Sequence, residues 1–273
     1  MAITAAEPTR ASVYRPEQEG LFFPEPPTFE SVADERRHRK ERLAASCRIF
    51  YELGYEYGFA GHLTVRDPEH PELYWTNPFA MTFSQVRVSD LILVDHDGTV
   101  VDGTWAVNRA GFVLHAAIHE ANPDIVASCH AHTINGMAWA ALGRPLDPIT
   151  QTACGFYEDQ ALITEEAGAV VVERGGAGRV AEAFGGAKIA IHQNHGLFSA
   201  GRESVDEAAW WFIAADRACR IQLKAEATGS PVKIISEEAA RHSRDHLATP
   251  FMAWLHYQPM YQDIVRRQPD LLD

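Results

Sequence analysis

Two histidines separated by a single residue, His130 and His132, could bind a metal ion together. They follow an apolar run at residues 124–129 that has the composition of a strand. Side chains two positions apart on an extended backbone lie on one face, so the two imidazoles form a chelating pair. Neutral imidazole is a good ligand for Zn, Mn or Fe(II). The alternative is that both rings only hydrogen-bond to backbone at the end of a strand.

A third imidazole can come from a second apolar run, residues 188–192, which is followed by His195. His192, at the end of that run, competes with His195 for this position. We therefore predict one divalent metal ion per subunit, bound by His130, His132 and His195. A further pair, His115 and His119, is four residues apart on an expected helix and shares one face, so it could also bind a metal or brace a ligand.

The elements that position these histidines alternate between strand and helix, which indicates a central sheet covered by helices. Strand character is found at residues 63–65, 72–75, 91–94, 124–129, 160–163, 169–172 and 188–192, with a hairpin turn at 95–98. Helical patterns cover residues 112–120, 134–142 and 178–184, and two longer ones run from Ser31 to Gly54 and from Ser204 to about Ala227.

Three regions differ in composition. Residues 1–30 are rich in Pro and Glu and are expected to form an arm. Residues 31–230 have the length and pattern of one α/β domain. Residues 231–273 form a helical tail whose aromatic stretch, residues 251–257, is expected to pack on the domain or on a neighbouring subunit.

Overall charge and cysteine spacing exclude several classes of partner. The formal charge of −13 over 273 residues, without a basic stripe, argues against nucleic acid and against an anionic membrane surface. Four widely spaced cysteines are expected to be reduced thiols. With no signal-like segment and no apolar run long enough to span a bilayer, a cytoplasmic protein is expected.

Five segments carry a resemblance to a known family. They are residues 61–64 (GHLT), 88–94 (VSDLILV), 115–119 (HAAIH), 130–132 (HAH) and 194–197 (NHGL). Together they resemble the class II aldolase and adducin family over most of residues 35–230. The resemblance implies a three-layer α/β/α sandwich around a mostly antiparallel sheet, and a homotetramer with active sites between subunits. It also places the family's three metal ligands on His130, His132 and His195, which adducin itself lacks, so an enzyme is expected.

The departures from the family pattern concern the substrate. The sugar-phosphate enzymes of the family carry an acidic residue at the position of Gly111. Their phosphate pocket corresponds here to His62, Arg109 and Ala110. A phosphate dianion requires several backbone and hydroxyl donors, whereas His62, Asn108 and Arg109 suit a carboxylate. We therefore expect a small-molecule carboxylic acid substrate without phosphate.

Three functions remain open from the sequence. The first is a metal-dependent lyase, a decarboxylase or retro-aldol enzyme, acting on a 2-oxo or 2-hydroxy acid with an aromatic or apolar part. In it Arg109 or His62 holds the carboxylate, and His115 or Tyr157 moves the proton. The second is a non-haem Fe(II) oxygenase that oxidatively decarboxylates an aromatic 2-oxo or mandelate-type acid, as the resemblance to aminocoumarin-pathway relatives implies. The third is an adducin-like binding protein with a structural metal, for which His192 or Cys154 would supply a fourth ligand.

Overall fold

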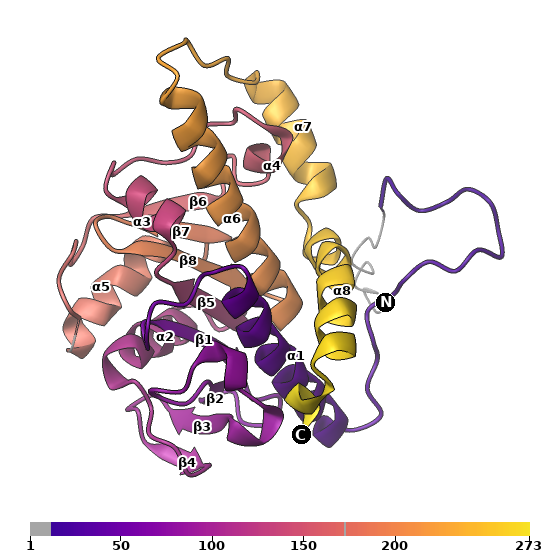
Figure 1. Cartoon of the computed structure of the whole chain (residues 1–273), viewed down its shortest axis with the longest axis vertical. Helices are drawn as coiled ribbons and strands as arrows, with labels where there is room; N and C mark the ends of the chain where they lie inside the picture. Colours follow the sequence, from indigo (N-terminus) through magenta and orange to yellow (C-terminus); the bar gives the residue numbers. More distant parts are fainter. Residues whose placement is uncertain (1–11, 172) are drawn as a thin grey trace, which may run out of the picture.

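The computed structural model describes residues 12–171 and 173–273, and within them one eight-stranded sheet forms the centre of the molecule (Figure 1). The strand order is β4-β3-β2-β1-β5-β8-β7-β6. The strands are β1 (Gly61–Arg66), β2 (Leu73–Thr76), β3 (Ile92–Asp95), β4 (Val100–Asp102), β5 (Ala127–Ala131), β6 (Gln160–Ile163), β7 (Ile189–His192) and β8 (Gly196–Gly201). Only the β6–β7 pair is parallel, so the expected mostly antiparallel sheet is confirmed.

One face of the sheet is covered by the long helices α1 (Val32–Glu52) and α6 (Val205–Glu226), and α8 (Pro250–Arg267) packs on both of them. Both predicted helix starts are confirmed: Ser31 accepts a hydrogen bond from the N–H of Asp34, and Ser204 accepts one from Glu207. The largest core cluster lies on this side, and it joins strand residues to helix residues. This layer buries alternate side chains of β1, β5 and β8 and leaves the others for the opposite face.

The opposite face carries α2 (Arg109–Ala121) and α5 (Arg174–Phe184), which pack on one another and complete the three-layer sandwich. Their core contains Leu114 and Ile118 from α2, Phe184 from α5 and Phe198 from β8. The predicted histidine site must lie on this face, because His130 alternates with Cys129 and Ala131, which belong to the other core cluster.

Shorter helices complete the chain. They are α3 (Ile134–Ala140), α4 (Gln151–Cys154), α7 (Glu237–Leu247), η1 (Phe83–Gln85), η2 (Val88–Asp90) and η3 (Pro269–Leu272). Residues 12–30 of the expected arm are irregular and form the loop that projects beside α8 in Figure 1, with Phe23 contacting Phe251. The first 11 residues of that arm lie outside the described residues. None of the helices in the described residues could span a membrane.

Two strand predictions need correction. Residues 169–171 form an irregular loop rather than a strand, and residue 172 lies outside the described residues. Their apolar, β-branched composition favours a strand, but here they form the wall of a cavity, and the side chain of Val170 is 77% exposed. The strand expected at 124–129 begins later, at Ala127, and continues through His130 to Ala131. The four cysteines are free and buried, as expected of reduced thiols.

Candidate metal centre

Three aromatic side chains form a row across the centre of the sheet. His62 of β1 and Phe198 of β8 are the cross-strand neighbours of His130 of β5 on either side. The ring of His130 stacks on Phe198 at 4.2 Å between centroids and lies nearly parallel to the ring of His62 at 6.1 Å. His130 is therefore held between two rings and is 1% exposed, which fixes its orientation.

His132 lies immediately beyond the end of β5, on the same side as His130. The next residue, Thr133, is the N-cap of α3 and accepts a hydrogen bond from the N–H of Gly136 at 3.0 Å. A capped helix start directly after His132 limits the freedom of the backbone at this position. The two-residue spacing thus acts as the sequence predicted, and it presents both imidazoles to one side.

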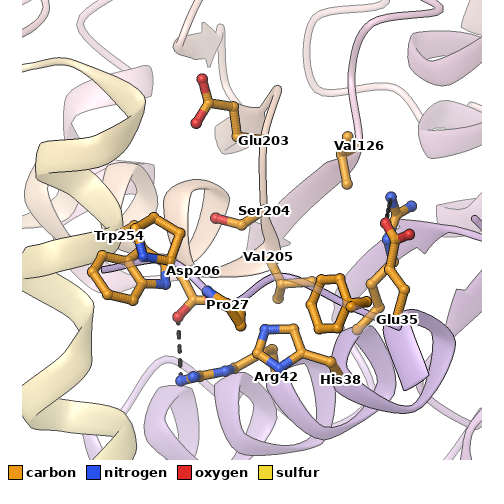
Figure 2. Close-up of a pocket in the computed structure, with 13 residues that line it drawn as sticks. Pro27, Glu35, His38, Arg42, Val126, Glu203, Ser204, Val205, Asp206 and Trp254 are labelled. Atoms are coloured by element: carbon orange, nitrogen blue, oxygen red, sulfur yellow. Dashed lines mark hydrogen bonds and ion pairs between the residues drawn. The ribbon is translucent and has the colours of Figure 1, made fainter. Parts of the chain in front are cut away.

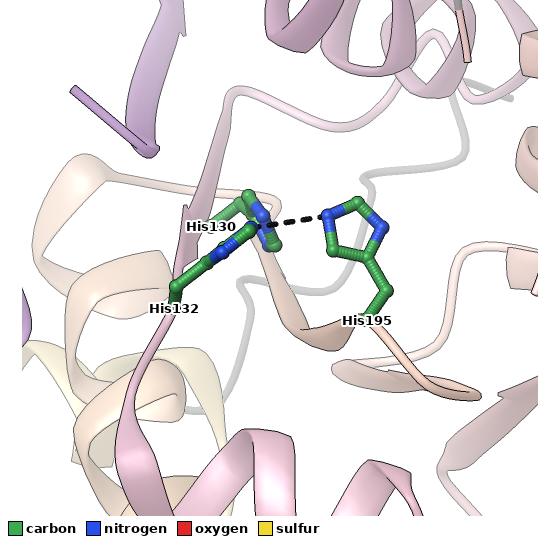
Figure 3. A group of neighbouring side chains, drawn as sticks. All are labelled: His130, His132 and His195. Carbon is green, nitrogen blue, oxygen red and sulfur yellow. Dashed lines mark hydrogen bonds between the residues drawn. The ribbon is translucent and has the colours of Figure 1, made fainter. Parts of the chain in front are cut away.

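His195 is placed by a tight hairpin between β7 and β8. His192 and Gly196 are the last paired residues, so the loop contains three residues, and Asn194 in its centre has a φ of 59°. Asparagine tolerates this left-handed conformation better than most residues. The hairpin turns the chain back so that His195 faces His130 and His132 across the end of the sheet (Figure 3).

The three predicted ligands form one compact group. One nitrogen from each of His130, His132 and His195 can be chosen so that all lie within 4.8 Å of one another. The Nε2 atoms of His132 and His195 are 3.1 Å apart. Two imidazoles on a tetrahedral zinc ion place their nitrogens about 3.3 Å apart, since each Zn–N bond is about 2.0–2.1 Å long. The donor type and spacing therefore fit one divalent ion.

One ring nitrogen of His130 already has a hydrogen-bond partner in the backbone. Its Nδ1 lies 2.8 Å from the carbonyl oxygen of Leu197. A carbonyl oxygen can only accept, so Nδ1 carries the hydrogen, and Nε2 of the neutral ring is left as the ligand atom.

A longer hydrogen-bond chain orients His195. The Nε2 of His192 lies 2.8 Å from the carbonyl oxygen of Glu165, so this nitrogen must donate. In the neutral ring of His192, Nδ1 is then an acceptor, and it lies 3.1 Å from Nδ1 of His195. His195 therefore donates from Nδ1 and keeps the lone pair of Nε2, the atom that faces His132.

Burial keeps these imidazoles neutral. Desolvation, with smaller contributions from His192 and His132, lowers the pKa of His195 to about 3. Burial also brings the pKa of His130 well below its ordinary value, and it lowers the pKa of His132. Neutral imidazoles at pH 7 bind a metal without first losing a proton.

The three histidines open onto a cavity of about 430 Å³. Its apolar lining includes Phe59, Leu114, Met137, Val170 and Val171, and none of its described lining residues is Asp, Glu, Lys or Arg. With neutral imidazoles the described lining of a single chain contributes no full charge to this cavity. A bound divalent ion would therefore be its dominant charge and would attract an anionic group.

Three other predicted site residues lie at or beside this cavity. His62 and Asn108 belong to its wall. Asn108 caps α2 by accepting a hydrogen bond from the N–H of Gly111 at 3.4 Å. His115 is fully buried, and its ring lies 5.9 Å from that of His62, with Nδ1 at 3.2 Å from Thr64 Oγ1. It lies behind His62 rather than on the cavity wall.

Arg109 and Tyr157 are not brought to the cavity within one chain. Arg109 is exposed and lies against Gly98 in the β3–β4 hairpin, outside the lining of the cavity. Tyr157 precedes β6 at the end of the sheet opposite to His192, and its ring contacts the guanidinium of Arg241 at 5.5 Å. The expected carboxylate and proton roles of these two residues therefore find no support in a single chain.

The alternative ligands do not join the group. His119 is buried beneath Tyr74, with the two rings 4.6 Å apart, and its Nε2 lies 2.9 Å from Thr64 Oγ1. His192 contacts Nδ1 of His195 rather than joining the ligand nitrogens. Cys154 lies in α4 and is not part of the group. Within the described part of the chain, the group contains three protein ligands, which leaves positions open for other molecules.

A second cavity lies on the other side of the sheet, among α1, α6, α8 and the arm (Figure 2). Its polar centre is an ion pair between Arg42 and Asp206, whose atoms are 3.3 Å apart, beside the indole of Trp254. It contains none of the histidines of the metal group, so the chemistry is assigned to the larger cavity.

Sequence reasoning did not identify the backbone acceptors Glu165 and Leu197, or Phe59 and the 168–171 loop in the cavity wall. Every residue has a backbone carbonyl, so the residue type does not indicate which carbonyl will accept a hydrogen bond. The position of the loop depends on contacts between distant segments.

Comparisons with known proteins agree with this fold. Residues 41–223 match the model of the class II aldolase and adducin N-terminal domain. The chain is 42% identical to a 4-hydroxy-3-prenylphenylpyruvate oxygenase/4-hydroxy-3-prenylbenzoate synthase of Streptomyces roseochromogenus subsp. oscitans, over 92% of this chain and 90% of that protein. It is also 42% identical to the decarboxylase NovR of Streptomyces niveus, over 92% of each chain. A solved L-fuculose 1-phosphate aldolase from Glaciozyma antarctica superposes with a TM-score of 0.84 at 40% identity, covering 91% of this chain and 96% of that one.

Proposed function

Because the chain belongs to the class II aldolase and adducin family, we propose that it is a metal-dependent enzyme that cleaves a carbon–carbon bond in a non-phosphorylated carboxylic acid. The substrate class is a 2-oxo or 2-hydroxy acid with an aromatic or apolar part. The names of the two Streptomyces relatives, a decarboxylase and an oxygenase, support this class of reaction.

One observation carries the proposal: His130, His132 and His195 open onto a cavity whose described lining has no charged side chain. Such a cavity needs the metal to hold an anionic head group, and three protein ligands leave room for a chelating acid. When bound, the ion would act as a Lewis acid: it would chelate the carboxylate and the adjacent oxygen, and in a substrate whose broken bond lies β to its carbonyl it would stabilise the resulting enolate.

Polar groups on the cavity wall can orient the acid. His62 and Asn108 lie there, next to the first turn of α2. The first N–H groups of a helix have no partner within the helix and favour an anion. These N–H groups, at Arg109 and Ala110, take the place of the Arg109 guanidinium in our proposal for carboxylate binding.

The apolar wall suits the remainder of the substrate. Phe59 is 60% exposed, and its ring packs edge-on against Phe79 at 5.1 Å. Together with Val170 it forms an apolar surface at the cavity that is uncovered in the single chain. An aromatic side chain of the substrate would bury this surface, which stabilises binding through the hydrophobic effect.

The first experiment measures CO2 release from phenylpyruvate and mandelate by protein loaded separately with Zn²⁺, Mn²⁺ or Fe²⁺. We expect turnover with at least one ion, and loss of turnover in a chelator and in the His132→Ala variant. Turnover that persists unchanged in both conditions would refute a metal-dependent reaction at this site.

A second candidate is oxidative decarboxylation by Fe(II) at the same site. The 42% identity to a protein named an oxygenase, over 92% of this chain, favours it. Oxygen uptake that accompanies CO2 release and requires Fe²⁺ would support the oxygenase. Full turnover under strictly anaerobic conditions would refute it and leave the non-oxidative lyase.

We also propose a cytoplasmic homotetramer, on the basis of the family resemblance. Light scattering coupled to gel filtration tests the assembly. A mass near four times 30.3 kDa is expected, and a monomer at micromolar concentration would contradict it.

A further inference from the structure

The ring of His62 fills the space next to Gly111. A Cβ atom added to Gly111 would lie 1.9 Å from Cε1, 2.2 Å from Nε2 and 2.4 Å from Nδ1 of His62. Real Cβ atoms do not approach other atoms this closely, and three ring atoms are involved at once. The ring at position 62 and any side chain at position 111 therefore exclude one another.

His62 also lacks hydrogen-bond partners. Its side chain is buried, with 8% of the residue exposed, and neither Nδ1 nor Nε2 has a partner in the described residues. Burying a polar group without a hydrogen bond is costly, and it is rare in native structures unless a ligand or water supplies the bond. An unsatisfied imidazole in the wall of a cavity therefore points to a partner within that cavity.

Neighbouring side chains do not offer this partner. His130, the nearest parallel ring, uses Nδ1 on Leu197 and is assigned Nε2 as a metal ligand. His115 is engaged with Thr64 through Nδ1, and its own Nε2 is also without a partner. The two unsatisfied rings of His62 and His115 do not hydrogen-bond to each other, so both nitrogens of His62 stay without a partner. Each nitrogen is buried, so a ligand in the cavity would meet one of them through a rotation of the His62 ring.

We propose that Gly111 and His62 form one specificity-determining pair. Gly111 leaves the space in which the His62 ring lies, and the ring forms a hydrogen bond with an oxygen-bearing group of an acid bound at the metal. The hydrogen bond to a ligand, the ligand half of this proposal, rests on the proposed function. The exclusion between the His62 ring and a side chain at position 111, the steric half, does not depend on any ligand.

The steric half is tested by thermal unfolding of Gly111→Ala, His62→Ala and the double variant. Gly111→Ala is expected to lower Tm, because the methyl group collides with the ring. In the His62→Ala background the same change is expected to be neutral or stabilising, since alanine is the better helix former. The matched control is Gly178→Ala in α5, where an added Cβ meets no atom within 4 Å. Equal Tm losses from Gly111→Ala in both backgrounds would overturn the pair.

The ligand half is tested by calorimetric titration of the Mn²⁺-loaded chain with oxalate, an unreactive small dicarboxylate. In His62→Ala and in His62→Asn, which keeps a polar side chain but loses the ring, Mn²⁺ affinity is expected to stay within about threefold of wild type. Oxalate affinity is expected to fall about tenfold, the effect of one lost hydrogen bond to a charged group.

The outcomes separate the two proposals. Oxalate affinity that is unchanged in both His62 variants would overturn the hydrogen-bonding role of His62. A large loss of Mn²⁺ affinity would instead make His62 a ligand and would also overturn that role. A wild-type protein that binds Mn²⁺ but not oxalate would contradict the ligand half and the proposed function, while the unfolding temperatures would still decide the steric half.

Discussion

The Nδ1 atom of His192 lies 3.1 Å from the Nδ1 atom of His195, and the other nitrogen of His192 is anchored on the carbonyl oxygen of Glu165. This contact selects the tautomer of His195 in which Nε2 is free to bind a metal. His192 is thus a positioning residue: it acts on the ion through His195 and does not belong to the ligand group.

Replacing His192 by Leu is expected to weaken metal binding about 10- to 100-fold, the usual effect of losing the partner of a metal-bound histidine. The physical reason is that the ring of His195 loses both its orientation and its tautomer preference. Titration with Co²⁺, followed by visible absorption, measures the affinity directly and independently of catalysis.

His119→Leu is the control for this prediction. It removes another buried imidazole, which contacts Tyr74 and Thr64 rather than the metal ligands. It should lower stability without a comparable loss of Co²⁺ affinity. Equal affinities of wild type and the folded His192→Leu variant would show that His192 does not position His195.

Phe59 is expected to determine selectivity for aromatic acids. Phe59→Ala should raise the KM for phenylpyruvate about tenfold and leave turnover of pyruvate nearly unchanged, because only the larger substrate reaches the apolar wall. Tyr57→Ala is the matched control, since Tyr57 is 70% exposed and is not part of this cavity lining. The same KM increase for both substrates would argue against this role.

The buried imidazole of His119 predicts a dependence of stability on pH. Burial, assisted by Arg66, lowers its pKa to about 3, whereas the unfolded chain has the ordinary value of about 6.5. Between these values the unfolded state binds the extra proton, so stability is fully present above pH 6.5 and is lost as the pH falls toward 3.

Urea unfolding of the metal-free protein between pH 4.5 and 7.5 measures this effect. In His119→Gln the free energy of unfolding should depend less steeply on pH, by about one proton or about 1.4 kcal/mol per pH unit below pH 6. Parallel pH profiles for the variant and the wild type would contradict the assignment.

Much of this structure follows from local sequence. Ser31 and Ser204 are N-cap residues before amphipathic runs, and both helices begin there. The two-residue spacing of His130 and His132 predicted a shared face because strand geometry alone determines it. The strand expected at 124–129 instead spans Ala127–Ala131, because the polar His130 belongs both to the strand and to the site.

Non-local contacts explain what the sequence did not reveal. Arg109 begins α2 three residues before the helical pattern expected at 112–120, and its side chain lies against Gly98 of the distant β3–β4 hairpin. Tyr157 lies far from the cavity because β6 and β7 are parallel, which places its end of β6 beside Ile189 rather than His192. The approach of Gly111 to His62 joins α2 to β1, residues 49 positions apart in the sequence, and no local pattern encodes it.

The most direct test of the central claim is the number of divalent ions bound per chain, measured by mass spectrometry of protein purified without chelator. We predict one ion in the wild type and none in His130→Ala or in His132→Ala. The ring of His132 is half-buried, so its removal should have little effect on the core. Full metal occupancy in either folded variant would contradict a site formed by His130, His132 and His195.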